Sequence, residues 1–381
     1  WIGEIPEGWE VIPAKFLFKN SDMRRIANDE QLTASQQFGI ISQKDYTELT
    51  GSKVVLANKG LEDWKHVKPF DFIISLRSFQ GGLEMSEITG CITWHYIVLK
   101  SCHKICSYYY KWLFKSDSYI HALQRTCSFI RDGQDLRYSN FIQVPLFEPP
   151  LAEQEKIADY LNAECSHIDA MLSKTRSSIE EYKKLKQAVI TQAVTKGVRG
   201  KREMKDSGVE WISEIPANWT VKRGKQLFSE TNERSETGSE ELLTVSHITG
   251  VTPRSQKNVN MFKSESLVGY KICHNGDLAA NTMWMWQGAI GVSKFHGVIS
   301  PSYNTYRQKT NDYYFEYLDY LLRIRPLIDA YTIHSTGITL SRLRLYPDSF
   351  LSLYFIVPPI TEQKEIADYL DTKCAEIDRL I

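Results

Sequence analysis

Two short patterns carry residue types that catalysis or metal binding would use. Asp348, followed by Glu362 and Lys364, matches the Asp…Glu-x-Lys order that holds Mg²⁺ in many nucleases. The corresponding place in the first half of the chain has Asn140 and then Glu153-Gln154-Glu155, so the order is not kept there. A glutamate in the first turn of a helix is also explained by the positive end of the helix dipole. The pattern therefore favours a helix start over a nuclease site.

The second pattern is Cys102-His103-Lys104-Ile105-Cys106, which could hold a metal ion. Structural zinc sites need a second pair of ligands, and none accompanies this one. We expect these thiols to be buried at the start of a helix. The sequence also lacks the Asn/Asp-Pro-Pro-Tyr/Phe motif of adenine methyltransferases and a glycine-rich phosphate loop.

What remains is a set of loops that combine aromatic, amide and basic side chains next to glycine. Arg, Asn and Gln can bond base edges, and Lys or Arg can hold phosphates. For any single residue, an ordinary place in a loop or core is the alternative. The predicted DNA-contacting residues are Lys44, Arg77, Ser78, Gln80, Trp94, His95, Arg131, Gln134, Arg254, Lys257, Asn281, Thr282, Trp284, Trp286 and Gln287.

Length and composition set the broad class. A chain of 381 residues with 42% hydrophobic and 24% charged residues is typical of a soluble protein with two domains. No apolar run is long enough to span a membrane, and seven cysteines at irregular spacing predict reduced thiols in the cytoplasm. Net charge is zero, but residues 173–205 hold ten Lys/Arg against three Glu, a local excess of +7. That cluster is either a solvated surface or a surface that faces phosphates or a partner.

The elements that position these loops occur twice. Residues 1–18 match 211–228 at ten of 18 positions, through the shared pattern WIxEIPxxW. Residues 149–172 match 358–381 at twelve of 24, through PPxxEQxxIADYL. Between these ends the two copies show only weak similarity, for example between residues 71–74 and 277–280 and between residues 90–93 and 297–300. Two units with a shared frame and different interiors suggest that both hold the same kind of partner while recognising different things.

The repeat also bears on the ends of the sequence. The first copy starts at Trp1 without a preceding Met, and Ile381 matches Leu172, partway along a helix. We therefore expect the sequence to be a piece of a longer chain.

Residues 152–196 contain no Gly or Pro and predict one long helix. Pro149-Pro150 prevents an earlier start, and Gly197 and Gly200 end it. Thr361 is the expected cap of the matching second helix. The two helices are expected to pack as an antiparallel coiled coil, with Cys165 and Cys374 as small fillers, although packing of each helix on a foreign subunit stays open. The seam positions are 161, 165, 168, 172, 175, 179, 182, 186, 189 and 193, continued by 370, 374, 377 and 381.

The interiors, about 16–148 and 226–357, hold short β-rich runs such as DFIISL and ISPSYNTYR, with helices expected at 107–124 and 313–331. The predicted fold is α+β: two β-rich recognition domains joined by two long helices, with an internal repeat. The expected boundaries are 1–150 for the first domain, 151–197 for the long helix, 198–359 for a linker and the second domain, and 360–381 for a truncated second helix.

These motifs together give the sequence a resemblance. The WIxEIPxxW start, the PPxxEQxxIADYL helix start and the KKLKQAVITQAVTKG helix end resemble those of the specificity subunits of Type I restriction–modification enzymes, over nearly the whole chain. The resemblance implies two target-recognition domains that each read half of a split, asymmetric DNA sequence, with the helices fixing the gap. It implies a non-catalytic subunit that binds no cofactor itself. S-adenosylmethionine, ATP and Mg would belong to partner methyltransferase and motor-nuclease subunits.

The repeated frame is the expected docking surface for two methyltransferase subunits. The alternatives are a DNA-cleaving nuclease and a protein-binding coiled-coil scaffold. The predicted partner-binding residues are Trp1, Ile5, Trp9, Gln154, Tyr160, Trp211, Ile215, Trp219, Gln363 and Tyr369.

Overall fold

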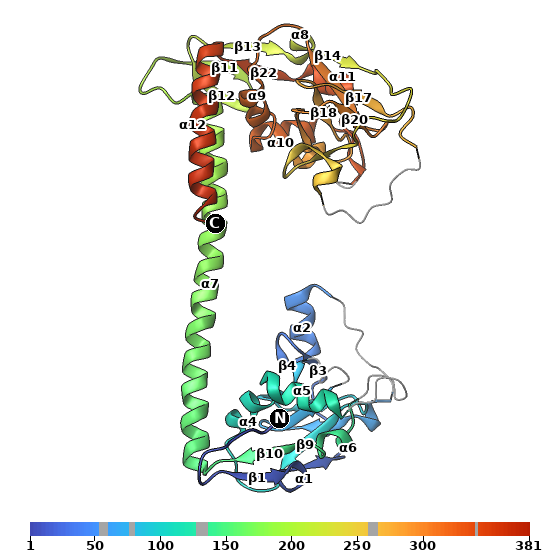
Figure 1. Cartoon of the computed structure of the whole chain (residues 1–381), viewed down its shortest axis with the longest axis vertical. Coiled ribbons are helices and arrows are strands. Elements are labelled where there is room, and N and C mark those ends of the chain that lie inside the picture. Colours follow the sequence, from blue (N-terminus) through green and yellow to red (C-terminus); the bar gives the residue numbers. More distant parts are fainter. Residues whose placement is uncertain (53–59, 76–80, 127–135, 258–265, 340–341) are drawn as a thin grey trace. The chain divides into compact units, whose positions relative to one another are not determined.

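The computed structural model divides into two compact units, Trp1–Leu172 and Ser173–Ile381 (Figure 1). It describes residues 1–52, 60–75, 81–126, 136–257, 266–339 and 342–381. Each unit is α+β, with its own sheet and its own hydrophobic core.

A four-stranded antiparallel sheet forms the centre of the first unit. Its strand order is β2-β9-β6-β7, and Phe18 pairs with Ser101 while Phe72 pairs with Leu99. Phe18, Phe72 and Leu99 are fully buried. Aromatic and branched side chains such as these pack well against neighbouring strands and against the helices that cover the sheet. The strands are β2 (Phe18–Ser21), β9 (Ile97–Ser101), β6 (Phe72–Ile74) and β7 (Glu84–Met85).

The second unit has a sheet of the same order, β14-β21-β18-β19. The segments that echo each other in the sequence, 71–74 and 277–280, supply equivalent strands, β6 and β18. The internal repeat expected from the sequence is therefore a repeat of topology. The strands are β14 (Phe228–Thr231), β21 (Asn304–Gln308), β18 (Leu278–Ala280) and β19 (Ile290–Val292).

Two small antiparallel strand pairs flank each sheet. Gly90 and Gly297 are the first residues of equivalent strands, β8 and β20. A Cβ on Gly90 would lie 2.5 Å from the Glu30 carbonyl oxygen, and a Cβ on Gly297 would lie 2.3 Å from the Glu241 carbonyl oxygen. Only glycine fits such an approach, which explains why this echo survives between the copies. The pairs are β3 (Leu32–Ser35) with β4 (Gly39–Ser42), β5 (Lys65–Val67) with β8 (Gly90–Ile92), β15 (Leu243–Ser246) with β16 (Gly250–Pro253), and β17 (Lys271–Cys273) with β20 (Gly297–Ile299).

Each helical stretch expected at 107–124 and 313–331 is two helices instead of one. In the first unit the chain breaks at Ser116, whose hydroxyl caps the next helix by accepting from the Tyr119 N–H. In the second unit Pro326 lies in the first turn of the next helix. The helices are α4 (Ser107–Leu113), α5 (Asp117–Arg125), α9 (Phe315–Leu321) and α10 (Arg325–Ile333).

The repeated motifs at the ends of each unit form strand pairs that lead into the long helices. β1 pairs with β10 in the first unit and β13 with β22 in the second. A further hairpin, β11 (Met204–Val209) with β12 (Ile212–Pro216), precedes β13. The remaining frame elements are β1 (Glu10–Pro13), α1 (Ala14–Leu17), α2 (Gln43–Thr50), α6 (Tyr138–Phe141), β10 (Pro145–Glu148), β13 (Thr220–Arg223), α8 (Gly224–Leu227), α11 (Pro347–Ser352) and β22 (Tyr354–Val357), with short 3-10 turns η1 (Leu61–Asp63), η2 (Arg254–Gln256) and η3 (Met285–Gln287).

The long helix α7 (Leu151–Lys196) has 46 residues, and α12 (Ile360–Asp378) has 19. They pack antiparallel within the second unit: Lys186 pairs with Asp378 at 2.7 Å and Arg199, just beyond α7, pairs with Glu365 at 2.7 Å (Figure 1). Gly197 follows the last helical residue with φ +76°, as expected. Thr361 does not cap α12, because the helix begins at Ile360 and the cap position is Pro359.

The contact between the two long helices uses some of the predicted seam positions and some neighbouring ones. Ala193, Leu370 and Cys374 are buried together, as expected. Ile190 and Val194 join them, one position after the predicted 189 and 193, because a straight helix drifts relative to a strict heptad repeat. Cys165 is only partly buried, and Ile168 and Leu172 are 53% and 49% exposed. Among the described residues, none of the helices has both the length and the hydrophobicity needed to cross a lipid bilayer.

Candidate nucleic-acid interface

The loop between β18 and β19 gathers five of the predicted contact residues in the second unit. Trp284 is 45% exposed and stacks on Trp286 at 5.9 Å between ring centroids, and the Trp286 Nε1 donates to the Met283 carbonyl at 3.1 Å. Two nearly parallel indoles at a surface can stack on a planar ligand. Thr282 and Gln287 are partly buried in the same loop.

Asn281 starts this loop but has a structural role. It is 5% exposed, and its Nδ2 donates to the Tyr303 hydroxyl at 2.9 Å while its Oδ1 accepts from the Met283 N–H at 3.2 Å. Burial and these bonds argue against direct contact of Asn281 with a ligand. The same side chain fixes the loop that presents Trp284.

The other described candidates lie in separate loops. Trp94 is 54% exposed and stacks on His95 at 3.5 Å in the turn between β8 and β9. Lys44 is exposed in the first turn of α2. Arg254 and Lys257 are partly buried around η2, and burial lowers the pKa of the Lys257 ammonium. Arg77, Ser78, Gln80, Arg131 and Gln134 lie outside the described residues.

The structure adds a feature that the sequence predictions missed, the tips of two equivalent hairpins. Gln36 and Gln37 are exposed between β3 and β4, and His247 and Ile248 are exposed between β15 and β16. The signal was present in the sequence, since Ser35-x-x-x-Gly39 matches Ser246-x-x-x-Gly250 while the residues between differ.

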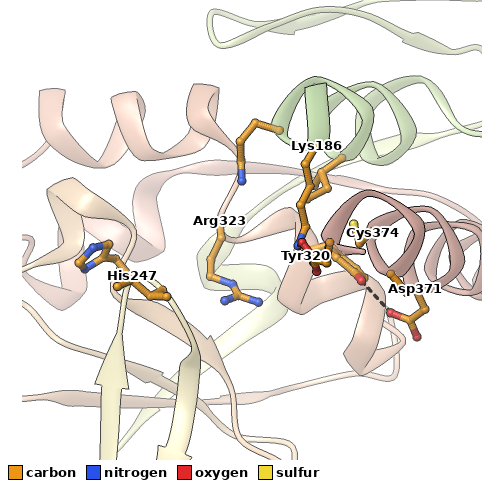
Figure 2. A pocket seen from close by; sticks show the side chains of 11 residues that line it. Lys186, His247, Tyr320, Arg323, Asp371 and Cys374 are labelled. Atoms are coloured by element: carbon orange, nitrogen blue, oxygen red, sulfur yellow. Dashed lines mark hydrogen bonds and ion pairs between the residues drawn. The ribbon is translucent and has the colours of Figure 1, made fainter. Parts of the chain in front are cut away.

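Each hairpin tip borders a pocket within its own unit. A pocket of about 400 Å³ in the first unit is lined by Ala34, Ser35, Gln36, Gln37, Tyr46, Ser75, Gly82, Glu84 and Tyr96. A pocket of about 490 Å³ in the second unit lies between the β15–β16 tip and the helix pair, as Figure 2 shows. There, the Tyr320 hydroxyl donates to Asp371 at 2.7 Å and Lys186 pairs with Asp378, so both carboxylates of the pocket have partners within the protein.

A partly buried ion pair lies beneath each hairpin. Lys115 pairs with Glu84 in the first unit, and burial raises the pKa of the Glu84 carboxyl. The equivalent cation in the second unit, Arg323, pairs with Asp319, which also accepts from the Val292 N–H at 3.0 Å. Lys115 and Arg323 thus occupy equivalent positions, but the carboxylate partner is in β7 in the first unit and in α9 in the second.

The repeated Gln of the helix start holds the frame together from inside. The Gln154 Oε1 accepts from the Cys106 N–H at 2.9 Å and its Nε2 donates to the Pro149 carbonyl at 2.8 Å. Gln363 does the same with Tyr314 and Pro358, both at 2.8 Å. Both glutamines are at most 2% exposed, so burial argues against their direct contact with a partner chain.

The repeated Trp residues are also largely internal. Trp219 is fully buried and its Nε1 donates to Glu362 at 3.0 Å, while Arg202 pairs with the same carboxylate and lies over the Trp219 ring. Ile215 is likewise fully buried. Trp1, Ile5, Trp9 and Trp211 are partly buried. The IADYL tyrosines differ, since Tyr160 is 66% and Tyr369 39% exposed.

The nuclease-like pattern that includes Glu362 and the possible metal-binding pattern from Cys102 to Cys106 both have structural explanations. Glu362 is fully buried and bonded to Trp219 and Arg202, so it is a frame residue. Cys102 is exposed, contrary to expectation, because it lies in the turn directly after β9, and Cys106 is partly buried at the start of α4. The described residues contain no group of three or more His, Cys, Asp or Glu that could hold a metal ion.

Comparison with solved structures identifies the fold. A crystal structure of the HsdS subunit from Thermoanaerobacter tengcongensis aligns over 99% of this chain and 92% of its own, with a TM-score of 0.58 and 14% identity. A chain from a study of complex assembly and conformational transition of the type I R-M system aligns over 100% and 93%, with a TM-score of 0.69 and 13% identity. The chain has the HsdS fold. No family model matches the sequence.

The HsdS fold confirms the fold class that the motifs predicted. Two α+β units with sheets of one order, a long helix and a second helix packed antiparallel to it are all present. At 13% and 14% identity the similarity concerns the fold, and the functional residues have to be argued from this chain itself.

Proposed function

We propose that this chain is the non-catalytic specificity subunit of a Type I restriction–modification complex and recognises a two-part, asymmetric sequence in duplex DNA. One observation carries the proposal: the two units share a sheet order and a hairpin, yet expose different side chains on them. The HsdS fold supports it. Different side chains on equivalent scaffolds favour different base sequences in the two halves of the target.

The exposed aromatic loops supply the second line of support. Trp94 on His95 in one unit and Trp284 on Trp286 in the other are rigid, planar surfaces beside polar loops. Contacts to phosphates by side chains such as Lys44 would add sequence-independent affinity that falls as salt rises. Reading of bases would come from the loops and hairpin tips.

The long helix would set the separation of the two half-sites. As a helix of 46 residues, α7 is about 69 Å long at about 1.5 Å per residue. Half-sites about one helical turn apart, roughly 34–36 Å, would present one face of the duplex to both units.

Partner subunits would dock on the repeated frame, with S-adenosylmethionine, ATP and Mg bound by those partners. Tyr160 and Tyr369 occupy equivalent, exposed positions, which suits two copies of one methyltransferase subunit. Trp211 also lines a largely apolar pocket of about 530 Å³ with Ile333 and Tyr354. The cytoplasmic location expected from the thiols stays a prediction.

The test is selection of bound duplexes from a random-sequence DNA library by the purified chain, followed by exchange of residues 16–148 for those of a relative with the same frame. We expect two fixed half-sites, of which the exchange alters one and leaves the other. A chain that selects nothing, or an exchange that alters both halves or neither, would overturn the proposal. Cleavage of DNA by the chain alone with Mg²⁺ would favour the nuclease alternative. Stable partner binding without any DNA preference would favour the scaffold.

A further inference from the structure

The tip of the β3–β4 hairpin holds two amide side chains on a fixed backbone. The Ser35 hydroxyl accepts from the N–H groups of Gln37 and Phe38, both at 3.3 Å, and Gly39 takes φ +68° to close the turn. The Phe38 ring packs edge-on against Tyr46 of α2 at 6.2 Å. Gln36 and Gln37 therefore project from an ordered support with their side chains exposed.

The pocket beside this tip is partly enclosed, and its lining is polar and apolar in equal measure. Its lining contributes the amides of Gln36 and Gln37, the hydroxyls of Ser35, Ser75, Tyr46 and Tyr96, and the carboxylate of Glu84. Glu84 is only 7% exposed. A volume of about 400 Å³ with this lining suits the hydrogen-bonding edge of a planar polar group.

The ion pair below the tip holds the pocket floor. The Lys115 Nζ donates to the Gly81 carbonyl at 2.9 Å and pairs with Glu84. A Cβ on Gly81 would lie 3.0 Å from the Gln36 Nε2, so the Gln36 side chain packs directly over this segment. Lys115 thus orders the segment from Gly81 to Glu84, on which the Gln36 side chain packs.

The second unit repeats the support but not the tip. The Ser246 hydroxyl accepts from the Ile248 N–H at 3.1 Å, Gly250 has φ +64°, and Arg323 lies beneath Gly250 at 3.4 Å from a Cβ placed there. His247 and Ile248 replace the two glutamines, and Figure 2 shows His247 on its hairpin beside Arg323. A turn that is repeated in both units but carries different exposed residues is suited to the recognition of two different base sequences.

We infer that Gln36 and Gln37 read an A·T base pair in the major groove, an inference that rests on the proposed function. A glutamine amide can donate to N7 and accept from the N6 amino group of adenine at once, which no other base pair allows. The His247–Ile248 tip lacks that amide, so the half-site read by the second unit should differ at the equivalent position.

The experiment compares the full chain with the double variant Gln36→Ala/Gln37→Ala in selection from a random duplex library. We expect the variant to lose preference for A·T at one position of one half-site, by about tenfold or more, with every other position retained. Gln143→Ala, an exposed amide elsewhere in the same unit, is the matched control and should keep the wild-type sequence.

The outcomes separate this inference from the proposed function. If the wild-type chain selects a two-part sequence and the double variant selects the same one, only the inference fails. A uniform fall in affinity at all positions would also overturn it, because that result indicates a phosphate contact. A wild-type chain that selects no sequence overturns the proposed function and this inference with it.

Discussion

Gln154 and Gln363 show how a recurring motif can be structural while its neighbours face outward. Each glutamine is buried and joins the start of a long helix to the start of a helix in the α+β unit, α4 or α9. Six residues after each of these glutamines, the motif presents an exposed tyrosine, Tyr160 or Tyr369. From the sequence, the glutamines and the tyrosines were all predicted to bind partners, because a repeated residue can be retained for internal packing or for an external contact.

Replacement of Gln363 tests its structural role. Gln363→Ala leaves the partly buried Tyr314 N–H and the buried Pro358 carbonyl without this partner, which should destabilise the second unit by about 2–3 kcal/mol. We expect a lower urea midpoint in unfolding followed by circular dichroism. Gln187→Ala, an exposed amide on α7, is the control and should change little. Equal effects of the two variants would show that the buried bonds contribute nothing.

Thiol reactivity should separate the cysteines by burial. Burial raises the pKa of the Cys91 thiol to about 11 and that of Cys273 to about 12. Both thiols therefore stay protonated between pH 7 and 9, and the thiolate is the reactive form. Iodoacetamide at pH 8 should modify the exposed Cys102 before Cys91 and Cys273, as read from peptide masses. Modification of Cys273 at the same rate in the folded protein would contradict this, whereas all should react in urea.

At the scale of elements, hydrophobic periodicity and breakers predicted most of what the structure contains. The limits of α7 follow from Pro149-Pro150 and Gly197, whose backbone preferences act locally. The break at Ser116 was missed, because a serine can lie inside a helix or cap the next one and only packing decides. The hairpin tips were missed because polar turn residues look alike whether or not they face a pocket.

The helix pair is the element with the sharpest energetic test. Leu370 of α12 is fully buried in the core of the second unit, whereas Leu185 of α7 is 49% exposed. Leu370→Ala should destabilise that unit by about 2–5 kcal/mol, and Leu185→Ala by less than about 0.5 kcal/mol. Thermal unfolding of both variants measures the difference. Similar melting temperatures would mean that α12 does not pack as described.

At the scale of the molecule, the duplication and the family resemblance could be recognised in the sequence because the frame residues repeat. The residues proposed to read bases could not be recognised in this way, because they differ between the two units. The two sheets share one strand order although their sequences match little between the ends. That divergence removes the pattern by which a site could be found, so Asn281 was chosen by its residue type and its place in a glycine-flanked loop, and it is buried. The hairpin tips become evident when the two units are compared in three dimensions, although the match of Ser35-x-x-x-Gly39 with Ser246-x-x-x-Gly250 is present in the sequence.

The central claim is the proposal that the length of α7 sets the gap between the two half-sites recognised in one duplex. Its most direct test inserts a second copy of residues 170–176 after Arg176, in a stretch of α7 whose side chains are exposed. Seven residues add about 10 Å and almost two full turns of helix. Selection from a random duplex library should then return the same two half-sites with a gap longer by about one to three base pairs. An unchanged gap would contradict the account.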